Sequence, residues 1–379
     1  ADARATAWNK ELGKIQIKGG TPDQRTTFYT AMYRTMERMV NISEYGRYRS
    51  AYDGKTHKAA NGFYVDDWSW DTYRALHPLR FIISPDRERD MLRSYISMYE
   101  QSGWMPTFPQ VYGDAKCMIG HHQAAIFADA WAKGIRSFSK SKAYAGLRKN
   151  AFKGTLLPWK EGPATELDNF YHENGYFPAL APGEKETIKA VHPYEKRQAV
   201  AVTLEHSYND WCLGQLAEAW NYHEDAEILK KRAENYKNVF NSETGFMSPK
   251  KADGSWVEPF DPKTSGGDGC REYFAEVNSW NYTWSVQHDI PALIELMGGE
   301  EAFIKKLDQL FTESLTGYAK WGTYKSQPDA TGLTGQFVMG NEPGFHVPYL
   351  YTLAGEPWKT QKRVRQLMDT WFRNDVMGI

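Results

Sequence analysis

The stretch from residue 273 to residue 284 places one carboxyl group among aromatic rings. Glu276 shares this stretch with five aromatic residues, and Trp256 precedes it. Apolar surroundings raise the pKa of a carboxyl group, because desolvation disfavours its charged form. A carboxylic acid that keeps its proton near neutral pH suits general acid catalysis. The alternative is a structural glutamate at the start of a helix beside an aromatic core, and the residue types alone do not separate the two.

A second candidate group is the pair Asp71 and Arg74, which follow Trp68 and Trp70. Residues three apart in a helix share a face, so the carboxylate and the guanidinium of this pair are able to hold adjacent hydroxyl groups of a sugar. The alternative is an i, i+3 salt bridge, which the segment by itself favours. Trp70 is suited to stacking on a sugar ring, although a single tryptophan more often packs in a core.

Oxygen ligands for a cation are predicted at Asn341 and Glu342, which precede a proline-fixed turn. Such ligands suit a hard cation, and we expect Ca²⁺ here. The alternative role for Glu342 is contact with the leaving sugar. His346 is more simply explained as a structural histidine, and His122 either has the same role or lines the pocket.

The elements that must position these residues are mostly helical. Amphipathic segments alternate with Gly-rich or Pro-rich connections, and short apolar alternations typical of strands are scarce. The pattern predicts an all-α protein of roughly eleven to thirteen helices, and a ring of six antiparallel helix pairs, an (α/α)6 barrel, fits that number. Residues 1–23 are predicted to be an N-terminal linker or extension, and residues 24–379 to form one domain. The predicted helices are 22–39, 68–83 with a bend at Pro78, 84–101, 122–133, 140–153, 200–222, 225–240, 273–288, 291–297, 300–315, 346–354 and 359–371.

Composition limits the possible functions. The 379 residues carry a formal net charge of −1 with no basic tract, which argues against nucleic-acid binding. No apolar run approaches the roughly 20 residues of a membrane span, and the N-terminal residues lack the apolar region of a signal peptide. Aromatic residues make up 15% of the chain, which favours a flat ligand such as a carbohydrate only weakly. The three cysteines, Cys117, Cys212 and Cys270, have no metal-binding or redox spacing and are predicted to be buried free thiols.

Five segments taken together resemble the calcium-dependent α-mannosidases of glycoside hydrolase family 92. The most specific are the segment with Asp71 and Arg74 and the segment with Asn341 and Glu342. The resemblance covers most of residues 25–379 and implies the helical catalytic domain of that family, an (α/α)6 barrel. Whole members also carry an N-terminal β-sandwich domain, for which we find no counterpart in the sequence. The five segments are 68–79, 118–134, 204–211, 273–284 and 340–351.

The resemblance also implies roles for individual residues. Glu276 matches the general acid, and Asp71 and Arg74 match the pair that holds sugar hydroxyls at the cleavage site. The implied activity is the removal of terminal α-linked mannose from glycans by an inverting, calcium-assisted mechanism. Members of the family act on glycans outside the cytoplasm, so a periplasmic or secreted protein is expected.

One part of the inverting mechanism is not matched. The family's general base is an aspartate in a segment expected just after residue 379, and Asp375 does not match it by position. Two interpretations follow: an incomplete version of a working enzyme, which we favour because the last predicted helix has no closing cap, or an inactive remnant. Met339 and Gly344-Phe345 also depart from the residues of many α-1,2-specific members, so the linkage is not implied and α-1,2 is slightly disfavoured.

Two other functions remain open at this point. One is another (α/α)6 glycoside hydrolase, such as a glucosidase or a trehalase-like enzyme, which calcium dependence and mannoside preference would distinguish. The other is a sugar-binding helical domain without catalysis, which would bind mannose but show no turnover.

Overall fold

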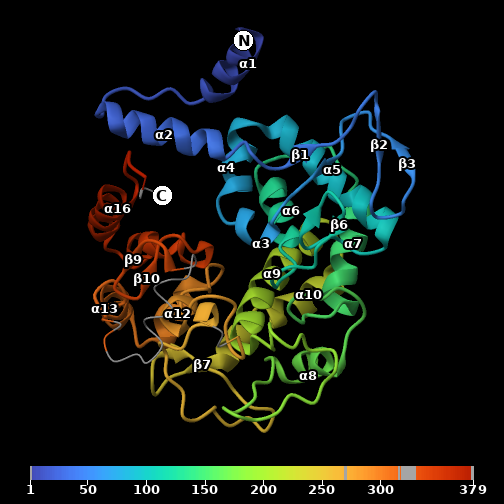
Figure 1. The fold of residues 1–379 in the computed structure, drawn as a ribbon. Helices are drawn as coiled ribbons and strands as arrows, with labels where there is room; N and C mark the ends of the chain where they lie inside the picture. Colours follow the sequence, from blue (N-terminus) through green and yellow to red (C-terminus); the bar gives the residue numbers. More distant parts are fainter. Residues whose placement is uncertain (1, 269–270, 315, 317–329, 377–379) are drawn as a thin grey trace.

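The computed structural model describes residues 2–268, 271–314, 316 and 330–376, and helices predominate in it (Figure 1). The α-helices are α1 (Asp2–Leu12), α2 (Pro22–Arg34), α3 (Ser69–Thr72), α4 (Leu76–Ile83), α5 (Pro85–Ser102), α6 (Gln123–Ala132), α7 (Lys140–Lys153), α8 (Glu166–Asn174), α9 (Ala199–Ala219), α10 (His223–Arg232), α11 (Ser279–Tyr282), α12 (Ile290–Leu296), α13 (Glu300–Leu310), α15 (Leu350–Leu353) and α16 (Pro357–Trp371). Short 3-10 helices are η1 (Asn235–Val239), η2 (Gly266–Asp268), η4 (Glu342–Gly344) and η5 (Val347–Tyr349).

The strands of the described residues are short and form five separate antiparallel pairs: β1 with β4, β2 with β3, β5 with β6, β7 with β8, and β9 with β10. No strand therefore contributes to a layer, and the helices supply the architecture. The strands are β1 (Val40–Asn41), β2 (Arg47–Arg49), β3 (Thr56–Lys58), β4 (Tyr64–Val65), β5 (Pro109–Gln110), β6 (Gly113–Asp114), β7 (Phe240–Asn241), β8 (Phe246–Met247), β9 (Leu333–Thr334) and β10 (Phe337–Val338).

Capping residues and prolines in the sequence predicted the start of several helices to within one residue. Thr21 caps α2 as predicted: its side chain accepts from the backbone N–H of Gln24, and the Gln24 side chain accepts from the Thr21 N–H. Helix α7 has the predicted bounds, and α5 begins at Pro85, one residue after the predicted start. Helix α8 was not predicted, although Thr165 and Asp168 form a capping box at its start. Helix α1 lies within the predicted N-terminal extension and has no buried residue. The domain boundary at residue 24 stays a prediction.

The prediction of one bent helix over 68–83 is wrong, because the structure has two helices there. Helix α3 ends at Thr72 and α4 begins at Leu76, so the break precedes Pro78. Pro78 lies in the first turn of α4, where backbone N–H groups have no partner within the helix and a proline costs nothing. Asp71 therefore lies in a separate four-residue helix, α3, and contacts with other segments must fix the direction of this helix.

The predicted helix over 273–288 is also wrong, since only α11 is helical there. The Asn278 side chain accepts a hydrogen bond from the backbone N–H of Asn281 and so starts the helix after residue 278. Glu276 consequently lies in a loop and not at the start of a helix.

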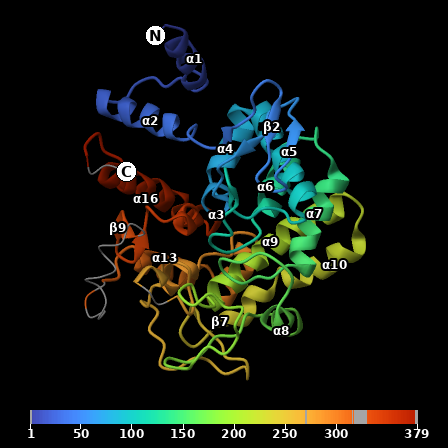
Figure 2. The same ribbon diagram turned by 45° about the vertical axis from the view of Figure 1, so that its right-hand side comes forward.

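Helix α9 connects two hydrophobic cores. Val200 and Leu204 belong to one core, which is built mainly from the second half of the chain, whereas Leu213 and Leu216 belong to the other, built mainly from residues 39–151. Helices α6, α7 and α10 pack against α9, which runs through the middle of the molecule in both views (Figures 1 and 2). The polar residues in the centre of α9 therefore lie where the two cores meet.

The described cysteines are free thiols. Cys212 is a buried free thiol as predicted, Cys117 is part-buried, and Cys270 lies outside the described residues. The C-terminal part lies beside α2, where Nδ2 of Asn374 donates a 2.9 Å hydrogen bond to Oδ1 of Asp23. None of the described helices has the length and apolar content that crossing a bilayer requires.

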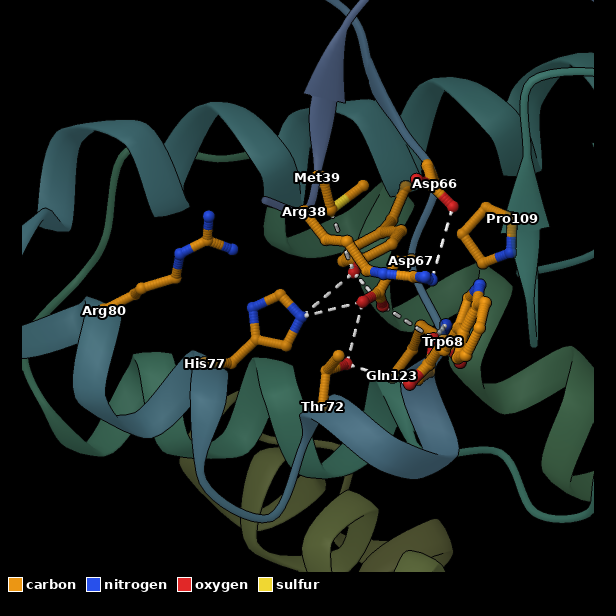
Figure 3. Close-up of polar contacts among 12 residues, drawn as sticks. Arg38, Met39, Asp66, Asp67, Trp68, Thr72, His77, Arg80, Pro109 and Gln123 are labelled. Carbon is orange, nitrogen blue, oxygen red and sulfur yellow. Dashed lines mark hydrogen bonds and ion pairs between the residues drawn. The ribbon is translucent and has the colours of Figure 1, made fainter. Parts of the chain in front are cut away.

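His77 lies between the carboxylates of Glu88 and Asp67, in the core built mainly from residues 39–151. Figure 3 shows the side of its ring that faces Asp67. His77 Nδ1 lies 2.7 Å from Oε2 of Glu88, and its Nε2 lies 3.5 Å from Oδ1 of Asp67. Burial opposes a charge on the imidazole, but the carboxylates of Glu88 and Asp67 outweigh burial and raise the pKa of His77 to about 10. His77 is therefore an imidazolium that joins α4, α5 and the residue before Trp68.

This raised pKa predicts a loss of stability in alkali. Because the folded-state pKa of His77 is above the unfolded value of about 6.5, its contribution is fully present below about pH 6.5 and is lost as the pH rises toward about 10. We expect the free energy of unfolding, measured in urea across that range, to fall with pH more steeply in the wild type than in His77→Gln. Equal slopes for the two proteins would show that His77 is not charged in the fold.

Candidate active site

Glu276 lies in the loop before α11, and its side chain is part-buried. The five aromatic residues of its segment are all buried, from 0% exposed for Phe274 to 8% for Trp280. Oε2 of Glu276 accepts a hydrogen bond of 2.5 Å from Nδ2 of Asn341. The aromatic side chains of the segment are therefore packed in the core, and Asn341, from a distant segment, contacts the carboxyl group of Glu276.

Asn341 and Glu342 reach the same place because η4 begins directly after Asn341. Asn341 is 2% exposed, and its Oδ1 has no hydrogen-bond partner within the described residues. Since Nδ2 of the same amide donates to Glu276, the amide oxygen is the atom left to bind a ligand.

Asp71 lies on α3, close to Glu342 of η4. Burial raises the pKa of Asp71, and the neighbouring negative charges of Glu342 and Asp67 raise it further, to about 8. Arg74 lowers the pKa of Asp71, but only as a smaller effect. The two segments with the most specific resemblance thus bring two acidic side chains together beside Arg74.

Arg74 pairs with Glu205, which lies in segment 204–211 but was not predicted as a site residue. Nη2 of Arg74 donates to both carboxylate oxygens of Glu205 in α9, at 3.0 and 3.2 Å. Nε1 of Trp70 donates to Oε1 of Glu205 at 3.1 Å, and Nε2 of His122 lies 3.0 Å from its Oε2. Glu205 is 3% exposed, and Arg74 is the strongest of the neighbours that hold its pKa below the ordinary value against the opposing effect of burial. The alternative of an Asp71–Arg74 salt bridge is replaced by this longer-range pair.

Trp70 and His122 therefore both contact Glu205, the ion-pair partner of Arg74. Trp70 is 2% exposed and packs in a hydrophobic core, with only its N–H directed to Glu205. The His122 ring stacks on Tyr73 at 4.2 Å, its Nδ1 lies 2.9 Å from Nδ2 of Asn209, and burial lowers its pKa. His122 is 1% exposed, so it supports Glu205 and does not face open space.

Several buried polar atoms around this cluster lack hydrogen-bond partners within the described residues, among them Nε of Arg74, the hydroxyl of Tyr282 and Oδ1 of Asn341. Buried polar groups are nearly always hydrogen-bonded, so a group of unpaired ones marks a place for a polar ligand or ordered water. Tyr282 lies among the charges of the site: burial raises the pKa of its phenol well above the ordinary value, Glu205 adds to this, and Arg74 and Glu276 also act on it. Tyr282 was not predicted as a site residue, because a tyrosine in an aromatic segment gives no signal of its own.

A large cavity of about 1700 Å³ opens beside Arg74 and extends to α2 and α16. Asp71 and Glu276 do not line it, so the polar cluster and not the cavity defines the site. The residues that line the end next to the cluster include Tyr73, Arg74, Gln287, Met339, Phe345 and His346.

The remaining candidates have structural partners. Nε2 of His346 lies 2.7 Å from the carbonyl oxygen of Trp284, and burial lowers the pKa of His346 to about 4, which agrees with a structural histidine. Met339 and Phe345, the departures from the family pattern, place apolar side chains at the cavity next to Arg74.

Calcium is the cofactor expected at Asn341 and Glu342, and the donor chemistry fits it. The unpaired amide oxygen of Asn341 is a neutral oxygen ligand, and the mutual effect of Asp71 and Glu342 indicates negative charge that a cation would compensate. Within the described part of the chain, no group of three or more His, Cys, Asp or Glu side chains is arranged to hold a metal ion. A cation here would thus need oxygen ligands from water or from substrate in addition to these side chains.

Comparison with known proteins gives consistent matches. The sequence profile of the glycosyl hydrolase family 92 catalytic domain matches residues 1–379. The inverting mannosidase BT2199 of this family, from Bacteroides thetaiotaomicron VPI-5482, is 34% identical with a TM-score of 0.82, over 100% of this chain and 49% of that one. The α-mannosidase BT3965 from Bacteroides thetaiotaomicron is 29% identical with a TM-score of 0.82, over 99% of this chain and 46% of that one.

A curated relative agrees with these structures. An uncharacterized secreted glycosidase of Arthroderma benhamiae is 23% identical over 410 residues, which cover 99% of this chain and 43% of that protein. The chain thus spans just under half the length of the relatives it matches. The similarity to the solved structures confirms the predicted fold class, all-α with an (α/α)6 barrel.

Proposed function

The chain belongs to glycoside hydrolase family 92, and we propose on this basis that it supplies the helical catalytic part of an exo-acting α-mannosidase. The observation that carries the proposal is the meeting of Glu276, Asp71 and Arg74 around buried polar atoms without partners. The substrate class is a glycan with terminal α-linked mannose. A location outside the cytoplasm is part of the proposal, supported by the relative that is named as secreted.

Glu276 is the proposed general acid that protonates the glycosidic oxygen. Because Oε2 accepts from Asn341, the proton to be transferred resides on Oε1. Proton donation by a positioned carboxylic acid lowers the barrier for a poor leaving group such as another sugar.

Arg74 and Asp71 are the proposed ligands of the sugar hydroxyls at the cleavage site. Glu205 holds one edge of the Arg74 guanidinium, so the unpaired Nε is presented in a fixed direction. Asp71 supplies carboxyl oxygens from α3. Fixed, desolvated groups of this kind orient a substrate at little entropic cost.

Calcium is proposed as the cofactor, held by Asn341 Oδ1 and Glu342. Ca²⁺ takes 6–8 oxygen ligands, so hydroxyl groups of the sugar and water complete the set. When bound, the ion would hold hydroxyls of the terminal mannose and favour a distorted ring. Inversion also needs a base that activates water about 6.5–9.5 Å from the acid, and we do not assign Asp375 to this role.

The first experiment is to measure mannose release from α-1,2-, α-1,3-, α-1,4- and α-1,6-linked mannobioses by a protein that carries this chain at the full length of its relatives, with and without a calcium chelator. We expect release that the chelator abolishes and that added Ca²⁺ restores, because the cation compensates the charge at Asp71 and Glu342. A direct readout is calcium binding by calorimetry, which should weaken in Asn341→Ala. His57→Ala, at a part-buried position on β3 whose side chain contacts Asp53, should bind as the wild type does.

The contrary outcomes separate the alternatives. Release that the chelator does not affect contradicts the calcium proposal but keeps the mannosidase. Mannose binding without release favours a sugar-binding domain, and release of glucose from α-glucobioses without release of mannose favours another glycoside hydrolase.

A further inference from the structure

We propose that Asp67 is a positioning residue for α3, the turn that presents Asp71 to the sugar. The inference rests on the proposed function, because it concerns the direction in which Asp71 is held. Asp67 lies at the centre of a buried polar cluster (Figure 3), and its side chain is 0% exposed.

The carboxylate of Asp67 holds both ends of α3. Its Oδ2 accepts from Oγ of Ser69 at 2.9 Å, and its Oδ1 accepts from Oγ1 of Thr72 at 2.8 Å. Ser69 and Thr72 are the first and last residues of this four-residue helix. A single helical turn is unfavourable by itself, and the residue before α3, Trp68, provides no side-chain cap. The two hydrogen bonds to Asp67 supply the missing constraint.

Asp67 is itself held by three surrounding elements. The hydroxyl of Tyr95 in α5 donates to Oδ2 at 2.7 Å, the His77 imidazolium of α4 lies 3.5 Å from Oδ1, and the Asp67 N–H donates to the Pro109 carbonyl at 2.9 Å. From α6, Nε2 of Gln123 donates to Oγ of Ser69 at 2.6 Å. These bonds join α3 to α4, α5 and α6, so the turn cannot rotate without breaking several of them.

The aromatic residue beside Asp67, Trp68, is held by two contacts although it is 38% exposed. The guanidinium carbon of Arg38 lies 3.4 Å from the ring centroid of Trp68, and the Phe108 ring stacks on Trp68 with centroids 5.5 Å apart. These two contacts hold the Trp68 ring and so the chain that enters α3. Figure 3 draws Trp68 and Arg38.

A matched set of variants separates positioning from stability. Asp67→Asn removes the negative charge and one acceptor that α3 requires. Thr72→Val keeps Asp67 and the volume of the side chain but removes one of the two hydrogen bonds. The control is Glu88→Gln, which removes the carboxylate on the far side of His77, 2.7 Å from Nδ1, and leaves every bond of α3 in place.

The measurements are kcat/KM for an aryl α-mannoside, the Kd of mannose by calorimetry, and the melting temperature. A displacement of a reacting group by about 1 Å costs on the order of 10²-fold, so we expect a loss of that size in kcat/KM for Asp67→Asn and a smaller loss for Thr72→Val, with weaker mannose binding in both. Glu88→Gln should lose thermal stability but keep kcat/KM and Kd at the wild-type values when assayed well below its melting temperature.

Each other outcome counts against the inference. If Asp67→Asn and Glu88→Gln are equally active at temperatures where both are folded, Asp67 is only structural. If Asp67→Asn does not fold, Thr72→Val decides, and wild-type values for it overturn the positioning role. If the wild type releases no mannose, the proposed function fails, whereas the Kd of mannose in the same variants still tests Asp67.

Discussion

Glu276→Gln is expected to lower kcat for mannobioses by about 10²–10⁴-fold, the usual contribution of general acid catalysis. The amide keeps the size of the side chain and its contact with Asn341 but has no acidic proton to give. Substrates with a good leaving group, such as dinitrophenyl α-mannoside, need little protonation and should lose much less. The comparison of kcat for the two substrate types therefore reports the acid role directly.

Glu272→Gln is the matched control for this prediction, because the residue lies in the same loop and its carboxyl group has no role in the proposed mechanism. It should leave both rates unchanged. Equal losses for the two substrate types in Glu276→Gln would assign Glu276 to binding, and unchanged rates would remove it from the mechanism.

Glu205→Met is expected to destabilise the protein by about 3–5 kcal/mol, the usual cost of leaving one member of a buried ion pair without its partner. The variant leaves the Arg74 guanidinium buried without its carboxylate partner, since Nη2 of Arg74 is 3.0 Å from Oε1 of Glu205. It also removes the acceptor of the Trp70 N–H. Urea unfolding measures this loss. Activity should fall as well, because Arg74 is no longer held along one edge.

The double variant Glu205→Met with Arg74→Met separates these two effects. Removing both charges should recover most of the stability, since no buried charge is left unpaired. Activity should not recover, because the proposed hydroxyl ligand is gone. A Glu205→Met protein as stable as the wild type would contradict the view that Glu205 organises the site.

Several features of this protein could be predicted from short stretches of sequence. The start of α2 follows from Thr21, Pro22 and Gln24, because the donors and acceptors of a capping box lie within four residues. The predominance of helices follows from the spacing of apolar residues, which reflects the period of the element itself. Glu276, Asp71 and Asn341 were proposed as site residues from their residue types and from the resemblance to the family.

The limits of that approach are visible at Glu276 itself. Aromatic residues at helical spacing predicted a helix over 273–288, but the Asn278 side chain caps α11 and leaves residue 276 in a loop. Similarly, the residues of segment 68–83 are compatible with one bent helix or with two. In both cases packing against other segments selected between local structures of similar energy.

The partners of the site residues were decided by the tertiary structure alone. Arg74 has an aspartate three residues away, yet it pairs with Glu205, 131 residues further along the chain. The charge of His77 depends in the same way on Glu88 and Asp67, which the fold places on either side of its ring. Local sequence fixes which groups are present and the period of the helices, because these depend on neighbours along the chain. Which groups are desolvated together is a property of the folded core, and burial is the largest influence on the pKa of Asp71 and of Glu205.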